Sequence, residues 1–408
     1  MRLVPRGLLR AFVPVLVGAS IAIPTALPAG AAVASAAAVT KVTVVGHGYG
    51  HGRGMGQYGA YGYATMYHWT YQRILARFYG RTTLGRPAST KDSTPVSVRL
   101  TPLDGKDVRV TSAAWFKVGN KYRFEAGQSA ILRYTGGTTY TVYRGGNGCG
   151  GSTQIRIGTV TTGVVRSSVA SPGANTAKML NVCEPGALAS YRGVLTFLSA
   201  DKTVAGRRLI NTVAMGDYLK SVVPAEMPAS WSDAGGGWGA QAVRAQTIAA
   251  RSYAATEKRY NYAKTCDTAT CQVYRGAARN GVSLEDARST AAVTATSGIA
   301  IVRGSAVQNA EFSASTGGWT AGGTFPAVSD AGDATAANPY HNWTVTVSTA
   351  PLAPYVSGTL TSVRVAGTDG HGRALAVRLT GSTGSAATIT GDQFRLALGL
   401  RSTLFRLA

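Results

Sequence analysis

The sequence predicts an α+β fold, in which a mainly antiparallel β unit precedes a mixed unit of helices and strands. Between about residues 94 and 200, short runs such as VSVRL, AILRY and GVLTFL alternate apolar and polar residues and are separated by turn residues. After residue 205, an alanine-rich helical segment at about 238–259 is followed by the strand-like runs AIVRG, HNWTVTVS and SVRVAG. We expect four segments: 1–38, 39–85, 86–204 and 205–408.

The first segment, 1–38, has the pattern of a secretion signal. Three arginines within the first ten residues precede an apolar stretch at 11–27, and small residues at 34–36 offer a cleavage site. Three prolines interrupt the apolar stretch, which argues against a permanent membrane anchor. The sequence therefore predicts an exported protein with no stable membrane span.

The second segment, 39–85, is predicted to be a strand at 42–45, a glycine-rich loop at 46–62 and a helix at 70–80. The loop contains His51, Gln57 and Tyr58. Its glycines spell G-x-G-x-x-G, but a dinucleotide site also requires an acid about 20 residues later and parallel βαβ units, which are lacking. Two interpretations remain, a structural turn and a carbohydrate-contacting loop.

The charge of the chain is strongly basic, with 41 Lys plus Arg against 18 Asp plus Glu and a formal net charge of +23. Such a chain favours anionic surroundings. The basic residues are scattered, and no run of five or more predicts a nucleic-acid-binding stripe. For an exported protein we therefore expect an anionic cell envelope, and not nucleic acid, as the partner.

The four cysteines are expected to form disulfides. An even number in an exported chain favours bridges, and proximity favours Cys149–Cys183 and Cys266–Cys271, although three pairings are possible. The alternative is a metal site. Because no Cys-x-x-Cys spacing is present, four such cysteines make a poor zinc site, and no metal site is predicted.

Glu226 is the acid that most resembles a catalyst. Only six of the 18 acids are Glu, and this one lies between Pro224 and Pro228 with Met227 and Trp231 nearby. Proline stiffens the backbone, and an apolar setting raises the pKa of a carboxyl because desolvation disfavours the anion. A carboxyl that stays protonated near neutral pH suits a general acid. The alternative is a structural acid, paired for instance with Arg251.

Two other regions could contact a ligand. The helix after Glu226 carries Gln246 and Arg251, and each could hold a substrate, although an arginine there could equally reach solvent or fix a carboxylate. The loop FSASTGGWTAGG at 312–323 offers hydroxyls beside glycines but lacks the G-x-S-x-G pattern of a serine nucleophile. Sugar contact and a plain turn both remain open for this loop. The residues concerned are Ser315, Thr316, Gly317 and Gly318.

Several blocks together resemble the SpoIID/LytB family of bacterial cell-wall proteins. The similar blocks are VVPAEMPASW (222–231), AQAVRAQTIAARSYA (240–254), CQVYRG (271–276), FSASTGG (312–318), NPYHNWTV (338–345), GLRST (399–403) and the glycine block with the following YQRILARFY. The resemblance implies a SpoIID-like mixed domain. It also implies a secreted, wall-associated peptidoglycan lytic transglycosylase, which cleaves MurNAc–GlcNAc bonds and leaves 1,6-anhydro-MurNAc ends without a cofactor.

By this resemblance Glu226 is the catalytic acid/base, and residues of three regions line the glycan cleft. These residues are Arg251, Gln246, Ser315, Thr316, Gly317, Gly318, His51, Gln57 and Tyr58. The sequence shows no second acid beside Glu226. A transglycosylase does not need one, because the C6 hydroxyl of the substrate attacks C1. The alternatives are a non-catalytic, wall-binding enhancer of a peptidoglycan amidase and, third, a surface adhesin or structural protein.

The sequence also departs from the family in two ways. The glycine block lies near the C-terminus in typical members but comes first here, so we expect the N-terminal segment to fold back onto the last domain. Some members carry a Cys/His metal pair near the CQVY segment and a histidine in the 312–318 loop, where this chain has Ala314. These differences argue against a family zinc site and fit a short disulfide.

Overall fold

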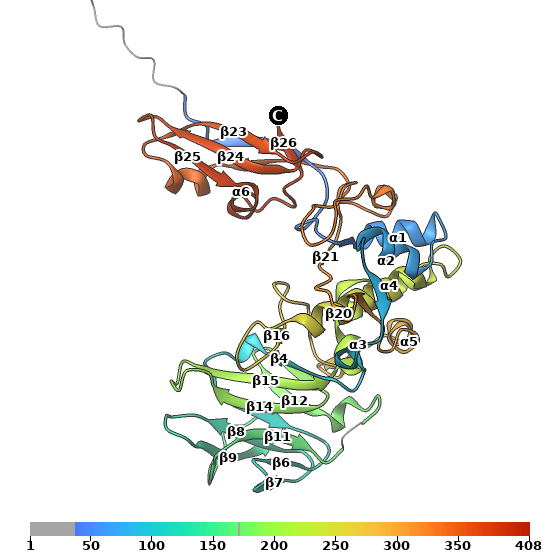
Figure 1. Ribbon diagram of the computed structural model, residues 1–408. Coiled ribbons are helices and arrows are strands. Elements are labelled where there is room, and N and C mark those ends of the chain that lie inside the picture. The colour runs from blue at the N-terminus through green and yellow to red at the C-terminus, as the bar shows by residue number, and fades with distance from the viewer. Residues whose placement is uncertain (1–36, 170–171) are drawn as a thin grey trace, which may run out of the picture. The chain divides into compact units, whose positions relative to one another are not determined.

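The computed structural model describes residues 37–169 and 172–408. Its contacts divide the chain into residues 1–37 and residues 38–408, and only the second unit is described below. The predicted secretion signal, 1–38, lies outside the described residues except for its last two. The described chain combines helices with predominantly antiparallel sheets (Figure 1), which confirms the predicted α+β class.

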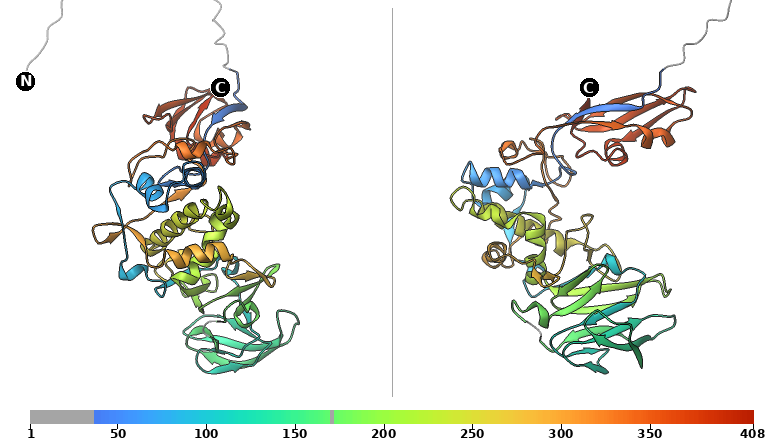
Figure 2. Two further views of the ribbon diagram at one scale, coloured as in Figure 1. Left: turned by 90° about the vertical axis from the view of Figure 1, so that its right-hand side faces the viewer. Right: turned by 180° about the vertical axis from the view of Figure 1, so that it is seen from behind.

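The helices gather around one alanine-rich helix, α4. Alanines on α4 are completely buried, and such small side chains let neighbouring helices approach closely. Helices α1, α2, α3 and α5 pack against it (Figure 2). The six α-helices of the described chain are α1 (Gln57–Thr65), α2 (Tyr71–Phe78), α3 (Met215–Glu226), α4 (Ala240–Thr256), α5 (Ala287–Ala295) and α6 (Gly391–Ala397).

Two large sheets form the β unit, and both contribute side chains to the main hydrophobic core. The order of strands across the first sheet is β10 (Gln154–Val160), β9 (Tyr140–Asn147), β8 (Gln128–Arg133), β5 (Val108–Thr111), β12 (Leu180–Glu184), β13 (Ala187–Tyr191), β17 (Ala278–Arg279) and β18 (Val282–Ser283). The order of strands across the second sheet is β16 (Thr265–Cys266), β4 (Pro95–Arg99), β15 (Arg207–Ala214), β14 (Val194–Ser199), β11 (Gly163–Ser167), β6 (Phe116–Val118) and β7 (Tyr122–Phe124). Strands β15 to β18 come from beyond residue 204, so the sheets also use residues of the last predicted segment.

The first strand of the described chain pairs with strands from the C-terminal region. Strand β1 (Lys41–Gly46) lies between β22 (Trp343–Ser348) and β26 (Phe405–Leu407), antiparallel to both. Figure 2 shows this strand in blue among the red C-terminal strands. The N-terminal segment therefore folds back onto the last part of the chain, as predicted.

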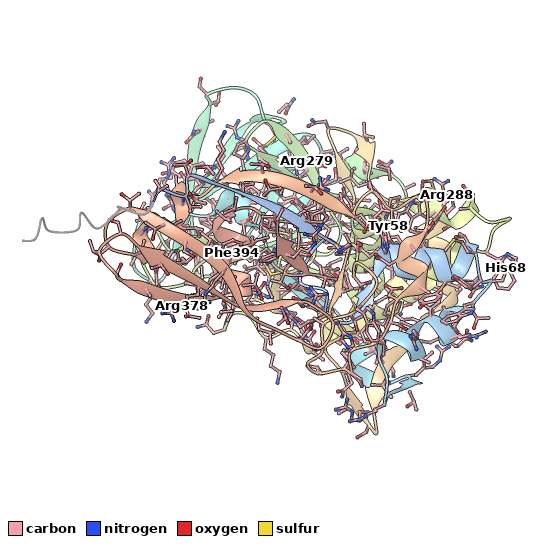
Figure 3. All side chains as sticks on the ribbon, turned by 90° about the horizontal axis from the view of Figure 1, so that it is seen from above. Tyr58, His68, Arg279, Arg288, Arg378 and Phe394 are labelled. Carbon is pink, nitrogen blue, oxygen red and sulfur yellow. A yellow bond between two sulfur atoms is a disulfide. The ribbon has the colours of Figure 1, made fainter. Side chains whose placement is uncertain are left out.

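A separate hydrophobic core holds this C-terminal region together. It includes Val44 from β1 and Phe394 from α6, which is labelled in Figure 3. The sheet β23 (Leu360–Thr368), β24 (Ala374–Gly381), β25 (Ala386–Thr390) contributes to the same core. The segment predicted as one mixed unit, 205–408, thus contributes to two hydrophobic cores.

Short strands connect distant parts of the chain. Strand β2 (Met55–Gly56) pairs in parallel with β21 (Phe312–Ser313), which places the glycine block beside the 312–318 loop. Isolated bridges join Tyr49 to Ser315 and Arg53 to Ala321. A further small sheet contains β20 (Ala306–Val307), β19 (Ala300–Arg303) and β3 (Thr83–Gly85).

Part of the glycine block is helical, which corrects the prediction of a loop through residue 62. Helix α1 begins at Gln57 and includes Gly59 and Gly62. A Cβ on Gly62 would lie 2.0 Å from the carbonyl oxygen of Gly332, and one on Gly59 would lie 2.1 Å from Asp330. These glycines serve close packing between α1 and the 3₁₀ helix at Ala331–Ala334 and are not turn residues.

Both expected disulfides are present. Cys149 is bonded to Cys183 and Cys266 to Cys271, so the proximity-based pairing is confirmed. The first bridge ties the turn after β9 to β12, within the β unit. The second closes a short loop that continues into Val273, beside Glu226.

Candidate active site

A cavity of about 710 Å³ lies where four regions of the chain meet. The regions are the glycine block, the end of α3, the disulfide loop and the start of the 312–318 loop. Their residues are Tyr49, Gly50, His51, Arg53, Gln57, Ala225, Glu226, Ala269, Thr270, Cys271, Val273, Glu311, Phe312, Ser313 and Ala314, and Tyr253 and Arg259 complete the lining. The fold thus brings residue 49 and residue 314 to one wall.

Glu226 is the last residue of α3, and its carboxyl lines this cavity. The amide of Val273 donates a hydrogen bond of 2.7 Å to Oε1. Among residues 37–169 and 172–408, no arginine, lysine or histidine forms an ion pair with it. Burial raises the pKa of Glu226, and the hydrogen bond from Val273 opposes that rise only in part. The group is therefore suited to carry a proton into a reaction.

Gln57 connects the glycine block to the helix that carries Glu226. Its Nε2 donates to the backbone carbonyl of Glu226 at 2.9 Å and makes a longer contact, 3.5 Å, with Oε1 of Gln246. Gln246 is completely buried and does not line the cavity. The structure thus places Gln57 in the wall and Gln246 behind it, where it supports Gln57.

His51 lines the cavity as a neutral side chain. Burial, together with the nearby charge of Arg53, lowers the pKa of His51 to about 4. The amide of Arg53 donates to His51 Nδ1 at 3.0 Å, so the single ring proton resides on Nε2. His51 can therefore donate a hydrogen bond from Nε2 without carrying a charge.

Glu311 is a second carboxylate in the same cavity, and the sequence analysis did not find it. Arg53 donates to both of its oxygens, with Nε at 3.0 Å from each and Nη2 at 2.8 Å from Oε1. Although burial opposes ionisation, the hydrogen bonds and the charge of Arg53 outweigh it and lower the pKa of Glu311. No local pattern could have revealed this pair, because the partners are 258 residues apart.

Tyr58 belongs to a row of aromatic side chains that begins at the cavity. Its ring centroid lies 4.9 Å from that of Trp231 and 5.9 Å from that of Tyr340. Tyr340 in turn contacts Tyr49, a half-exposed residue of the cavity wall, and Tyr61 packs against Trp231. Tyr58 is labelled in Figure 3. It does not line the cavity itself, but its row offers aromatic faces of the kind on which sugar rings stack.

The 315–318 loop is organised by a buried aspartate that the sequence analysis missed. Asp333 accepts hydrogen bonds from Ser315 Oγ, from the amides of Thr316 and Gly317, and from His341 Nδ1, all between 2.9 and 3.0 Å. Thr316 Oγ1 also donates to Asp330.

The predicted sugar contacts Ser315 and Thr316 are buried, and none of the four residues 315–318 lines the cavity. Their observed contacts shape the loop whose earlier residues, Ser313 and Ala314, form the wall.

Arg251 is completely buried and lies away from the cavity. Its guanidinium donates to the carbonyls of Thr296 and Ile299 and to Asp92, at distances from 2.7 to 3.1 Å. A side chain without exposed surface cannot contact a glycan. The prediction that Arg251 lines the glycan cleft is therefore corrected to a structural role, in which Arg251 joins α4 to its neighbours.

Within the described chain, no group of three or more His, Cys, Asp and Glu side chains is placed to hold a metal ion. No helix in residues 37–169 or 172–408 has the length and apolar character needed to cross a bilayer.

The family comparison concerns the centre of the chain. Residues 204–302 match the SpoIID family, described as stage II sporulation protein. This part of the chain is similar to that family, whose description names sporulation. It contains α3 with Glu226, α4, α5 and the Cys266–Cys271 bridge, whereas the glycine block and residues 311–318 lie outside the match. Searches of curated proteins and of solved structures gave no match.

Proposed function

We propose that this protein is an exported, wall-associated lytic transglycosylase that cleaves MurNAc–GlcNAc bonds of peptidoglycan glycan strands. The observation that carries the proposal is the placement of Glu226. Its carboxyl lines a cavity of about 710 Å³, has no ion-pair partner among the described residues, and has a pKa raised by burial. The SpoIID match over residues 204–302 supports the choice of substrate.

Glu226 performs two proton transfers in the proposed reaction. The protonated carboxyl first gives its proton to the glycosidic oxygen, and the bond between that oxygen and C1 of MurNAc breaks. The C6 oxygen of the same sugar then bonds to C1 and loses its proton to the Glu226 carboxylate. The products are a GlcNAc hydroxyl and a 1,6-anhydro-MurNAc end, and the enzyme regains its proton without a cofactor.

The cavity walls suit a sugar polymer. Gln57, His51 and Arg53 offer polar groups, and Tyr49 in the wall begins an aromatic row that continues outside the cavity through Tyr340 and Tyr58 to Trp231. Aromatic rings carry a large apolar area with little conformational entropy to lose, which suits stacking against a sugar. The high positive charge of the chain favours retention in an anionic wall.

Replacement of the acid tests the proposal. We expect Glu226→Gln, which retains the shape of the side chain, to reduce release of anhydro-muropeptides from purified, peptide-free strands by about 10²- to 10⁴-fold, the usual contribution of a general acid. Glu125→Gln is the matched control, because Glu125 pairs with Arg123 in the β unit and neither residue lines the cavity. If both variants release anhydro ends as fast as the unaltered protein, the assignment is wrong.

The second candidate is a non-catalytic enhancer of a peptidoglycan amidase. The aromatic row favours it, because this row could hold a glycan without any chemistry at Glu226. For this candidate, anhydro ends would be absent with the protein alone. The rate of peptide release by an added amidase would rise equally with the unaltered protein and with Glu226→Gln.

A further inference from the structure

Glu311 has no place in the single-acid mechanism, although it lies in the same cavity as Glu226. Its side chain is 23% exposed and that of Arg53 is 40% exposed. An ion pair with this much exposure contributes little to stability. Stability alone therefore does not explain why the chain, which has only six glutamates, holds two of them in one cavity.

The backbone of Glu311 is fixed by buried neighbours. Its carbonyl oxygen accepts hydrogen bonds from the hydroxyl of Tyr79, at 2.8 Å, and from the amide of Met55, at 3.3 Å. Tyr79 and Met55 are both completely buried. Gly54 has a φ of +65°, and a Cβ there would lie 2.0 Å from the same carbonyl oxygen. The backbone position of Glu311 thus depends on Gly54 and Met55 of the glycine block and on Tyr79, which follows α2.

The surroundings shift the pKa values of the two carboxyls of the cavity in opposite directions. Burial raises the pKa of Glu226, whereas hydrogen bonds and charge from Arg53 outweigh burial and lower the pKa of Glu311. Two carboxyls whose environments separate their pKa values can take different roles in one reaction. The groups that act on Glu311 or on its neighbours are Arg53, His51, Tyr79, Tyr253 and, through His51, Asp392 and Arg395.

We propose that Glu311 is a second catalytic carboxylate, which stabilises the positive charge that develops on the sugar while Glu226 protonates the leaving oxygen. This inference rests on the proposed function. Cleavage of a glycosidic bond passes through an oxocarbenium-like state, and an anion held at a fixed position in the cavity stabilises the positive charge that develops there. Glu311 stays ionised throughout and transfers no proton, so the two proton transfers of Glu226 are unchanged.

The first test is Glu311→Gln, which removes the charge and keeps the shape. A group that acts only in the transition state changes kcat and leaves KM unchanged. On peptide-free glycan strands we expect kcat to fall about 10²- to 10³-fold, the usual effect of losing one electrostatic contact, while KM stays within about threefold. Glu125→Gln, whose carboxylate pairs with Arg123 in the β unit, serves as the control and should retain its kcat, because neither residue lines the cavity.

The second test does not depend on the folding of that variant. Arg53→Met removes the partner that keeps Glu311 ionised, so the acid limb of the pH–kcat profile should move to higher pH and activity should recover as the pH rises. A role in folding alone would not shift a pH limb.

An unchanged acid limb in Arg53→Met, an unchanged kcat in folded Glu311→Gln, or an effect on KM alone would each overturn the inference. If the unaltered protein releases no anhydro ends, the proposed function fails as well, whereas an active unaltered protein with an unaffected Glu311→Gln variant overturns this inference alone.

Discussion

At the scale of single residues, the proposed glycan cleavage depends on the protonation state of Glu226. The residue ends the proline-containing final turn of α3, and its only side-chain hydrogen bond in the described chain comes from the amide of Val273. One amide donor does not compensate for the water lost on burial, so the protonated form is more favoured than in an exposed glutamate. The carboxyl can therefore act as an acid at a pH where exposed glutamates are ionised.

The raised pKa of Glu226 predicts where kcat/KM falls on the alkaline side of its pH profile. A general acid must be protonated, so activity is present below the pKa of Glu226 and is lost as the pH rises through it. Because burial raises that pKa above the ordinary value of 4.5, kcat/KM should begin to fall at a higher pH than an ordinary glutamate would allow. Measurement of kcat/KM against pH on peptide-free strands checks this, and an alkaline limb at or below pH 4.5 would contradict it.

The role of Glu226 could be predicted from the sequence, whereas that of Glu311 could not. Scarcity of acids and two flanking prolines single out Glu226 within one short segment. Glu311 becomes notable only through Arg53, which folding brings to it through the parallel pairing of β2 with β21. The burial of Arg251 was equally hidden, because Asp92 and the turn with Thr296 and Ile299 lie far from Arg251 in the sequence.

At the scale of elements, the two disulfides have different consequences. The Cys266–Cys271 bridge precedes Val273, whose amide bonds to Glu226, and Cys271 itself lines the cavity. The Cys149–Cys183 bridge lies in the β unit and closes a longer loop, with a sequence separation of 34 residues. In the chain-entropy model the longer loop contributes about 4 kcal/mol to stability and the shorter one about 2 kcal/mol.

We therefore expect the two double alanine variants, one for each disulfide, to affect different properties of the protein. Replacement of Cys149 and Cys183 should lower the free energy of unfolding by about 4 kcal/mol and leave kcat of the folded enzyme unchanged. Replacement of Cys266 and Cys271 should cost less stability but reduce kcat several-fold, since the Val273 amide loses its fixed position. Denaturant unfolding and steady-state rates of both variants check this. Equal kcat values in the two folded variants would contradict the link between the short bridge and the site.

Element types could largely be predicted from sequence periodicity, and the exceptions have a packing cause. The alanine-rich helix, the helix at Tyr71–Phe78 and the strand at Lys41–Gly46 follow local patterns. Helix α1 does not, because glycine has a low helix propensity. Its glycines are tolerated since Gly59 and Gly62 face Asp330 and Gly332 at distances that leave no room for a side chain. Tertiary contact thus outweighs propensity in this segment.

At the scale of the whole molecule, the order of segments along the chain differs from their order in space. Strand β1 pairs with β22 and β26, and the glycine block then passes from this sheet to the wall of the cavity. Pairings across some 300 residues leave no periodic signal in the sequence. The return of the N-terminal segment could be predicted only from the resemblance of scattered blocks to a family in which the glycine block comes late.

The most direct test of the central claim is product analysis in water enriched in ¹⁸O. Purified protein acts alone on peptide-free glycan strands, and mass spectrometry determines the new chain ends. If Glu226 works with the C6 hydroxyl of the sugar, the new ends are 1,6-anhydro-MurNAc and contain no ¹⁸O. Reducing ends labelled with ¹⁸O would show attack by water, and the absence of new ends would show that the cavity performs no cleavage; either result contradicts the account.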